Sequence, residues 1–159
     1  MAEAEDLFDD DPVLQWVTFR LEDEIYGVNV MQVQEVLRYS EIAPVPGAPP
    51  YVTGIINLRG NVVAVIDTRK RFGLLSKEED DATRIVITEA SGHTIGIIVD
   101  AVTEVKYLKE SQIESAPDVG NDESSKYIQG VTTVDGKLLI LVDLNKFLSV
   151  EEWREVAAI

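Results

Sequence analysis

Short runs of alternating apolar and polar residues, a pattern typical of β-strands, make up most of this chain. In LQWVTFRL (14–21) the side chains alternate between two faces, a short polar turn follows, and IYGVNV (25–30) returns as the second strand of a hairpin. RIVIT (84–88) and TIGIIV (94–99) predict a second hairpin. About ten such strands, rich in β-branched residues, favour a mainly all-β fold.

One stretch of the pattern occurs twice. YVTGIINLRGNVVAVIDTRKRF (51–72) aligns with YIQGVTTVDGKLLILVDLNKFL (127–148) at an offset of 76 residues. Upstream, residues 16–36 align with residues 85–105 at an offset of 69. Two copies of one unit predict two similar modules, because a solenoid needs about three repeats. Residues that are identical in the two copies include Gly54, Gly60 and Asp67, which align with Gly130, Gly136 and Asp143.

We therefore expect two SH3-like five-stranded β-barrels packed together, with short helices and a C-terminal helix. Asp67 is predicted to cap a short helix, and Ser149 with Glu152 forms a capping box that opens the last helix. Residues 31–38 predict helical turns or a bent edge strand, and residues 109–126 a long surface loop. The expected divisions are an acidic disordered tail (1–12), a first barrel (13–73), a linker (74–83), a second barrel (84–148) and a helix packed on a barrel (149–159).

Composition argues against an enzyme. The chain has no Cys and a single His, His93, which is predicted to lie on a turn, so thiol chemistry, a transition-metal cluster and a Cys–His pair are not expected. The nucleotide-binding glycine motifs are missing, so we expect no cofactor. A formal net charge of −15 disfavours nucleic acid and anionic lipid as partners. The N-terminus is not a secretory signal, and no apolar run is long enough to span a membrane.

The segment Gly54-x-x-Asn57-Leu58-Arg59-Gly60, followed by Val65-Ile66-Asp67-x-Arg69, resembles the bacterial chemotaxis coupling protein family CheW. Gly96-Ile97-Ile98-Val99-Asp100 is similar to that family too, and the similarity covers about residues 14 to 150. The chain departs from the family at Thr68, where Leu is usual, and at Gly47, where Asn is common.

The resemblance implies a non-enzymatic adaptor that joins the cytoplasmic tip of methyl-accepting chemotaxis receptors to the regulatory domain of the histidine kinase CheA. Such a protein is cytoplasmic, is recruited to membrane receptor arrays, and is monomeric when isolated. The receptor is expected in a groove between the barrels formed by Val33, Glu35, Val36, Gly54, Arg59, Gly96 and Val105. The kinase is expected at an exposed end of the first barrel near Val28, Val30, Ile42 and Val45.

Packing in the core would explain the valines and glycines of these sets equally well. Arg59 differs, because it precedes a turn glycine where a side chain is exposed, and its copy in the repeat is Asp135. An arginine kept only for folding should recur in the second copy. Arg59 and Glu35 therefore mark the expected receptor site most specifically.

Other classes of protein stay open at this point. The chain would fit the regulatory domain of a CheA kinase or a CheV-type fusion, although the start at Met1 and the capped last helix favour a complete adaptor. A nucleic-acid-binding pair of SH3-like barrels is opposed by the charge. A small enzyme on a β-barrel would need a cofactor that the motifs do not indicate.

Overall fold

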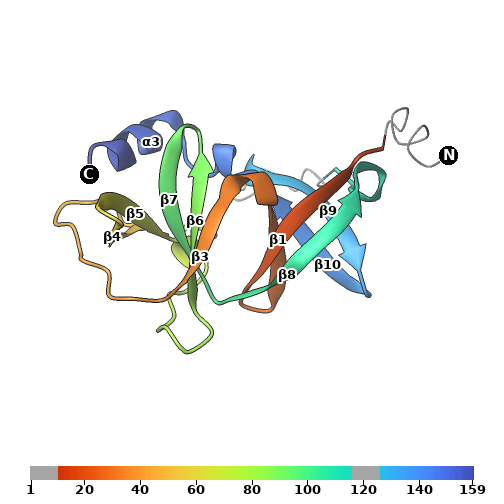
Figure 1. The fold of residues 1–159 in the computed structure, drawn as a ribbon, viewed down its shortest axis with the longest axis horizontal. Coiled ribbons are helices and arrows are strands. Elements are labelled where there is room, and N and C mark those ends of the chain that lie inside the picture. The colour runs from red at the N-terminus through yellow and green to blue at the C-terminus, as the bar shows by residue number, and fades with distance from the viewer. Residues whose placement is uncertain (1–10, 116–125) are drawn as a thin grey trace.

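A computed structural model describes residues 11–115 and 126–159, which form two five-stranded β-sheets side by side (Figure 1). The predicted acidic tail lies outside the described residues except for Asp11 and Pro12, and so does most of the predicted 109–126 loop. No helix of the described part is long and apolar enough to cross a membrane. The elements are β1 (Val13–Leu21), β2 (Glu24–Asn29), η1 (Val30–Gln32), β3 (Val33–Arg38), β4 (Val52–Leu58), β5 (Asn61–Asp67), α2 (Thr68–Arg71), β6 (Arg84–Ala90), β7 (His93–Val99), β8 (Ala101–Lys109), η2 (Glu110–Gln112), β9 (Ile128–Val134), β10 (Lys137–Val142), η4 (Leu144–Lys146) and α3 (Val150–Ala157).

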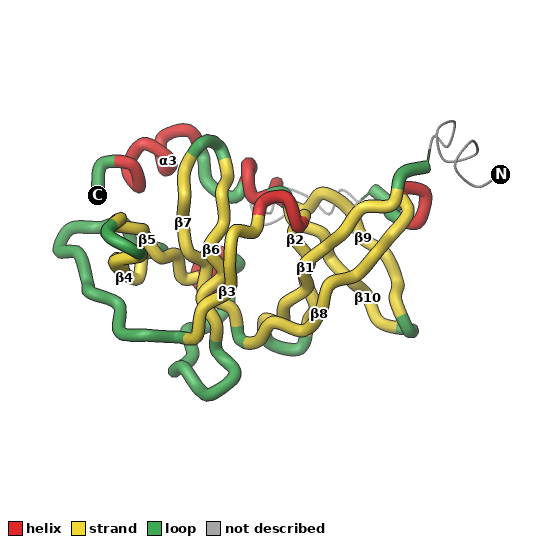
Figure 2. The backbone as a smooth tube through the Cα atoms, in the orientation of Figure 1, coloured by secondary structure: helices red, strands yellow, loops and turns green. Residues whose placement is uncertain are grey.

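Each sheet curls into a small barrel. Barrel A has the strand order β8-β1-β2-β10-β9, and barrel B has the order β3-β6-β7-β5-β4. Neighbouring strands are antiparallel except for two parallel pairs, β2 with β10 and β5 with β7. The two barrels lie at opposite ends of the longest axis in Figure 2, with β3 and β1 near the middle. The predicted all-β class with two packed barrels is confirmed.

The predicted barrel boundaries are wrong, because the two halves of the chain exchange hairpins. The β1–β2 hairpin belongs to the same sheet as β8, β9 and β10, whereas β3, β4 and β5 pair with the β6–β7 hairpin. The strands of barrel A thus lie within residues 13–29, 101–109 and 128–142, and those of barrel B within residues 33–67 and 84–99. Two short crossings, η1 and Asp100, carry the chain between the barrels. A repeat shows that two units are alike, but it cannot show which hairpin joins which set of strands.

Three apolar clusters hold the fold together. Trp16, Leu108, Leu139 and Leu141 fill barrel A, while Ile56, Val63, Val65, Ile85 and Ile87 fill barrel B. A third and larger cluster joins the barrels and contains Val17, Phe19, Ile97, Phe147 and Trp153 among others. Strand β1 contributes to two clusters, so Trp16 (0% exposed) and Phe19 (1%) are both buried although they lie on opposite faces. The shared cluster makes the two barrels one packed unit.

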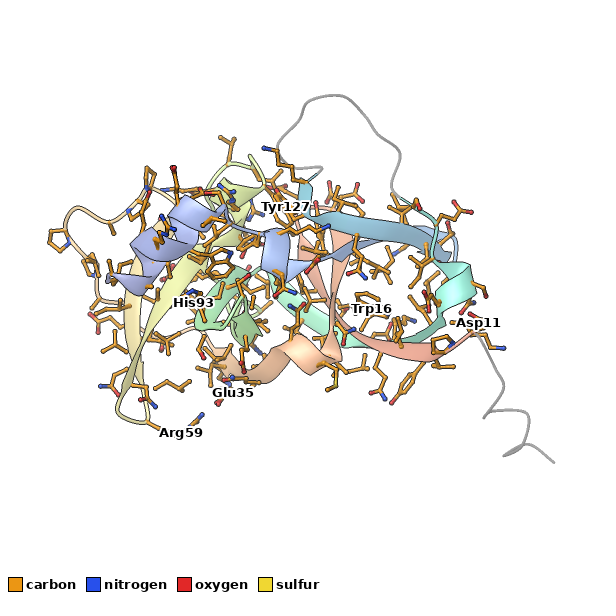
Figure 3. All side chains as sticks on the ribbon, turned by 90° about the horizontal axis from the view of Figure 1, so that it is seen from above. Asp11, Trp16, Glu35, Arg59, His93 and Tyr127 are labelled. Atoms are coloured by element: carbon orange, nitrogen blue, oxygen red, sulfur yellow. The ribbon has the colours of Figure 1, made fainter. Side chains whose placement is uncertain are left out.

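The predicted helix caps are confirmed. The Asp67 carboxylate accepts a hydrogen bond from Lys70 N (3.2 Å) at the start of α2. Ser149 Oγ accepts from Glu152 N (3.1 Å), and Glu152 Oε1 accepts from Ser149 N (2.8 Å), which completes the capping box of α3. Helix α3 then buries Trp153 in the shared cluster, where the indole stacks on His93 at a centroid distance of 5.2 Å. His93 is therefore explained by packing against α3 (Figure 3).

The prediction for residues 31–38 is confirmed, and part of the predicted 109–126 loop is more ordered than expected. Residues 31–38 begin in η1 and continue as β3, which is an edge strand of barrel B. The start of the predicted 109–126 loop forms η2, and Glu114 then makes an isolated bridge to Val131 of β9. Asp11 accepts hydrogen bonds from the Ser111 backbone N and Oγ, both at 2.7 Å. Asp11, which lies inside the range predicted to be a tail, is thus attached to the folded body.

Candidate functional site

Arg59 lies in the two-residue turn between β4 and β5, and its backbone has a φ of +51°. The equivalent position in each of the other hairpin turns of the described residues is also left-handed, at Glu22, Ser91 and Asp135. The conformation therefore belongs to the turn type, in which the first residue needs a positive φ. Asp and Asn adopt this region more readily than other non-glycine residues. An arginine there is a poor choice for the backbone, which points to a role for its side chain.

The Arg59 side chain reaches across to β3 and forms a two-pronged ion pair with Glu35. Nη1 donates to Glu35 Oε1 at 3.2 Å, and Nη2 donates to Glu35 Oε2. Both residues lie at one edge of barrel B in Figure 3. The Arg59 side chain is 69% exposed and that of Glu35 is 27% exposed. The pair thus links the edge strand β3 to the β4–β5 turn while its arginine stays open to solvent.

The two charges stabilise each other's ionised forms. Hydrogen bonds from Arg59 are the main cause that holds the pKa of Glu35 below its usual range, and the positive charge of Arg59 adds to the effect. The same contacts raise the pKa of Arg59. An ion pair as exposed as this one contributes little to folding. Its main structural consequence is a guanidinium group held in one orientation, with N–H groups left over for a partner.

Several apolar side chains on β3, β5 and β8 are exposed. Val36 follows Glu35 on β3 and is 41% exposed, and Val62 on β5 is 61% exposed. Val105 on β8 is 43% exposed, and Val33 packs partly against the shared cluster. The predicted receptor residues that lie on the surface are therefore Glu35, Val36, Arg59 and Val105, with Val33 half-buried.

The two predicted site glycines have packing roles. Both Gly54 and Gly96 are buried. A Cβ atom on Gly54 would lie 2.2 Å from the carbonyl oxygen of Ala43, whose segment bridges to β4. A Cβ atom on Gly96 would lie 2.9 Å from Ile85 Cγ2 inside barrel B. Neither glycine presents a surface to a partner, so the core-packing interpretation holds for both.

The predicted kinase residues divide in the same way. Val28 is 0% exposed and belongs to the shared cluster, so the prediction that it lies on an exposed barrel end is wrong. The sequence placed it on a strand next to a turn but could not show that the second barrel covers it. Val30 and Ile42 are half-buried against the clusters. Val45 lines an open groove of about 640 Å³ between the proline-rich segment 45–50 and the end of α3 at Glu155, Ala158 and Ile159.

We also examined the described residues for a metal site and for a pair of reactive carboxylates. The described residues contain no group of three or more His, Cys, Asp or Glu side chains placed to hold a metal ion. Asp67 and Asp143, the aligned acids of the repeat, cap α2 and η4 respectively. A pair of barrels that presents an ion pair and apolar side chains on its surface defines a protein-interaction domain.

Comparison with known proteins identifies the family. Residues 15–152 match the family model described as a CheW-like domain. The chain is 33% identical over 141 residues to the chemotaxis protein CheW of Rhizobium meliloti strain 1021, covering 89% of this chain and 90% of that protein. It is 36% identical over 135 residues to the chemotaxis protein CheW of Bacillus subtilis strain 168, covering 85% and 86%.

The fold agrees with a solved structure of the same kind. The crystal structure of the scaffolding protein TtCheW from Thermoanaerobacter tengcongensis matches with a TM-score of 0.81 and 35% identity, over 89% of this chain and 96% of that one. The chain therefore belongs to the CheW-like family, whose members are non-catalytic scaffold or adaptor proteins of chemotaxis.

Proposed function

We propose that this protein couples the cytoplasmic tip of a methyl-accepting chemotaxis receptor to the histidine kinase CheA. The observation that carries the proposal is the ion pair between Glu35 and Arg59, which lies on the surface of a CheW-family fold at the positions expected to bind the receptor. The adaptor would act in the cytoplasm, where receptor tips and kinase meet.

The receptor surface is formed by the ion pair and its apolar neighbours. A receptor helix offers apolar side chains at i, i+3, i+4 and i+7, which need apolar contacts such as Val36 and Val105. The guanidinium of Arg59 has five N–H groups and donates two of them to Glu35, so it can still donate to a carboxylate or a carbonyl on the helix. Because Glu35 already orients it, little side-chain entropy is lost on binding.

The kinase surface is proposed at the groove lined by Val45. Val45 and the neighbouring prolines form one wall of the groove, and the end of α3 forms the other. Prolines lose little conformational freedom on binding, so such a wall is preorganised. Ile42 borders the same segment, and Val30 lies at the crossing between the barrels. Separate surfaces for receptor and kinase would let one adaptor hold both partners at once.

Titration calorimetry against a receptor cytoplasmic fragment and against the regulatory domain of a CheA-type kinase tests the proposal directly. Saturable binding to both partners, and a ternary complex in which neither displaces the other, are the expected results. Binding to only one of them, or mutual displacement, would rule out a coupling role. A gel shift at low salt with duplex DNA serves as the control for the nucleic-acid alternative and should show no complex.

A further inference from the structure

Barrels A and B close their edges in different ways, although the repeat makes them alike. In barrel B the ion pair of Arg59 and Glu35 spans the seam between edge strand β3 and the β4–β5 turn, and Leu37 of β3 packs on the barrel core. The equivalent seam in barrel A lies between edge strand β8 and the β9–β10 turn. There the repeat places Lys106 at the position of Leu37 and Asp135 at the position of Arg59.

The seam of barrel A is open. A pocket of about 260 Å³ lies between β8 and the β9–β10 turn. Its apolar wall consists of Ile25, Val134, Leu138 and Leu139, and Leu138 is 47% exposed. At its base the Thr18 hydroxyl donates to the Glu104 carbonyl (2.7 Å) and accepts from Glu104 N (3.1 Å). Since the Thr18 hydroxyl is satisfied, the pocket favours an apolar occupant.

Two carboxylates and two lysines line the entrance. Glu104 is 59% exposed and Asp135 is 88% exposed, whereas Lys106 is 26% exposed and is held between them. Lys106 Nζ lies 3.0 Å from Glu104 Oε1 and 3.8 Å from Asp135 Oδ2. Lys137 also lines the pocket, so these four charges sum to zero locally. Both carboxylates are nevertheless more exposed than Lys106, and the chain as a whole has a charge of −15, which attracts cationic segments.

We propose that the seam pocket of barrel A binds a basic segment of a partner protein, which inserts one apolar side chain between β8 and the β9–β10 turn. Basic side chains on either side of the inserted residue would pair with Glu104 and Asp135. Binding pockets for small molecules usually have a volume of about 300–1,000 Å³, so this smaller pocket suits a single side chain better than a whole ligand. The proposal does not rest on the proposed receptor and kinase surfaces.

The test uses the full chain, labelled with ¹⁵N, and follows its amide shifts during titration with the peptide Ac-Arg-Leu-Arg-NH₂ at about 0.15 M salt. Millimolar binding is expected, with shifts concentrated around Ile25, Val134 and Leu139. The peptide Ac-Arg-Gly-Arg-NH₂ has the same charge but no apolar side chain, and it should bind at least about tenfold more weakly. Three outcomes would each overturn the proposal. They are equal binding of the two peptides, shifts concentrated at other sites, and no shifts at peptide concentrations of about 10 mM.

Two variants separate insertion from general attraction. Lys106→Leu places in barrel A the residue that barrel B carries at the equivalent position, so it should fold while filling the pocket. Insertion predicts at least about a tenfold loss of binding to the leucine peptide. General attraction predicts the opposite, because removing Lys106 makes the site more acidic, and tighter binding by this variant would contradict insertion.

Asp135→Asn removes one entrance charge and should weaken binding about two- to fivefold, as expected for an exposed ion pair. Asp81→Asn is the matched control, because it changes the net charge equally at an exposed position outside the pocket. It should leave binding unchanged. Equal effects of the two substitutions would show that the peptide responds only to the total charge of the protein.

Discussion

Arg69 and Asp100 form a buried two-pronged ion pair that ties α2 to the crossing between the barrels. Arg69 Nε donates to Asp100 Oδ1 at 2.8 Å, and Nη2 donates to Oδ2 at 2.6 Å. The two side chains are only 9% and 6% exposed. Glu22 N in the β1–β2 turn also donates to Asp100 Oδ2, at 2.9 Å. One carboxylate therefore holds together α2, the crossing between β7 and β8, and the hairpin that barrel A receives from the first half.

Removing one partner of this pair should destabilise the protein strongly. Arg69→Ala leaves the buried Asp100 carboxylate without its two-pronged partner and with Arg20 Nη1 at 4.0 Å as a weaker ion pair. Removing one partner of a buried ion pair costs about 3–5 kcal/mol. The double variant Arg69→Leu/Asp100→Asn leaves no buried charge and should lose less than the single variant. Urea denaturation monitored by circular dichroism gives both free energies of unfolding. A single variant as stable as wild type would show that the pair contributes nothing to the joint between the barrels.

The ion pair also predicts how stability depends on pH. Burial alone would raise the pKa of Asp100, but hydrogen bonds from Arg69 and Glu22 N, together with the charge of Arg69, outweigh burial and lower the pKa. A lowered pKa contributes stability above the unfolded-state pKa of Asp, about 3.9, and this contribution is lost as pH falls through the folded-state value. The free energy of unfolding of the wild-type protein should therefore fall toward that of the double variant below about pH 4.

Substitution of Arg59 should separate receptor binding from folding. Arg59→Ala should lower affinity for a receptor cytoplasmic fragment by at least about thirtyfold, as expected for a hydrogen-bonded interface charge. Its melting temperature should stay close to that of wild type, because the side chain is 69% exposed. Kinase binding should also survive. Titration calorimetry with both partners measures these effects.

Two controls sharpen the Arg59 experiment. Arg38→Ala removes a positive charge from the end of β3 without touching the ion pair, and receptor affinity should hardly change. The charge swap Glu35→Arg/Arg59→Glu keeps an ion pair but reverses its direction, so it should not restore binding if Arg59 itself contacts the receptor. Full rescue by the swap would instead make the pair a positioning element for β3 and the turn.

Val45→Asp should weaken kinase binding while receptor binding remains. Val45 lines the groove beside the end of α3, and a charge placed there must be desolvated when a partner covers it. The matched control is Val150→Asp, on the first turn of α3, where Val150 is 69% exposed and does not line the groove. Calorimetry with the kinase regulatory domain distinguishes the two. An equal loss of affinity for the kinase and for the receptor in the Val45 variant would indicate misfolding rather than a kinase surface.

The buried strand of barrel A should not tolerate truncation. Leu139 is 3% exposed and Leu141 is 0% exposed, and both fill the barrel with Trp16. A buried Leu→Ala change costs about 2–5 kcal/mol, against a total stability of about 5–15 kcal/mol. Leu139→Ala/Leu141→Ala should therefore be mostly unfolded in circular dichroism at room temperature. A soluble double variant with a cooperative melt would contradict this placement of the core.

Local features of the fold followed from the sequence because they depend on neighbouring residues. The helix caps at Asp67 and Ser149 lie where the sequence predicted them. Contacts between residues far apart in the sequence could not be predicted from the pattern. Arg59 and Glu35 were both predicted as site residues, yet their direct contact was not, because the repeat alignment relates copies and not neighbours in space.

The same limit explains the errors at other sites. The sequence around Val28 does not distinguish it from an exposed valine on a strand. Only the packing of barrel B against it shows that it is buried. Lys106 was missed because a polar residue on an alternating strand is unremarkable by itself. A signal existed one position beyond the stretch of the upstream repeat that was aligned, where Lys106 falls on Leu37. A charge that replaces an apolar residue between copies marks a place where the two barrels differ.

The exchanged hairpins predict that neither half of the chain folds alone. A fragment of residues 1–76 lacks the partners of β1–β2, and a fragment of residues 77–159 lacks the partners of β6–β7. Each fragment should therefore lack a cooperative melt, and mixing them should restore both the melt and partner binding. Circular dichroism of each fragment and of the equimolar mixture checks this. A first fragment that melts cooperatively alone would contradict the exchange.

The crossing of strands between the barrels also orders events during synthesis. Barrel B needs residues only as far as Val99, whereas barrel A needs β10, which ends at Val142. As the chain leaves the ribosome, barrel B can close while the β1–β2 hairpin, made first, still waits for β8, β9 and β10. The β1–β2 hairpin is thus synthesised early but packed late, and its buried face at Trp16 stays open to chaperones until translation is nearly complete.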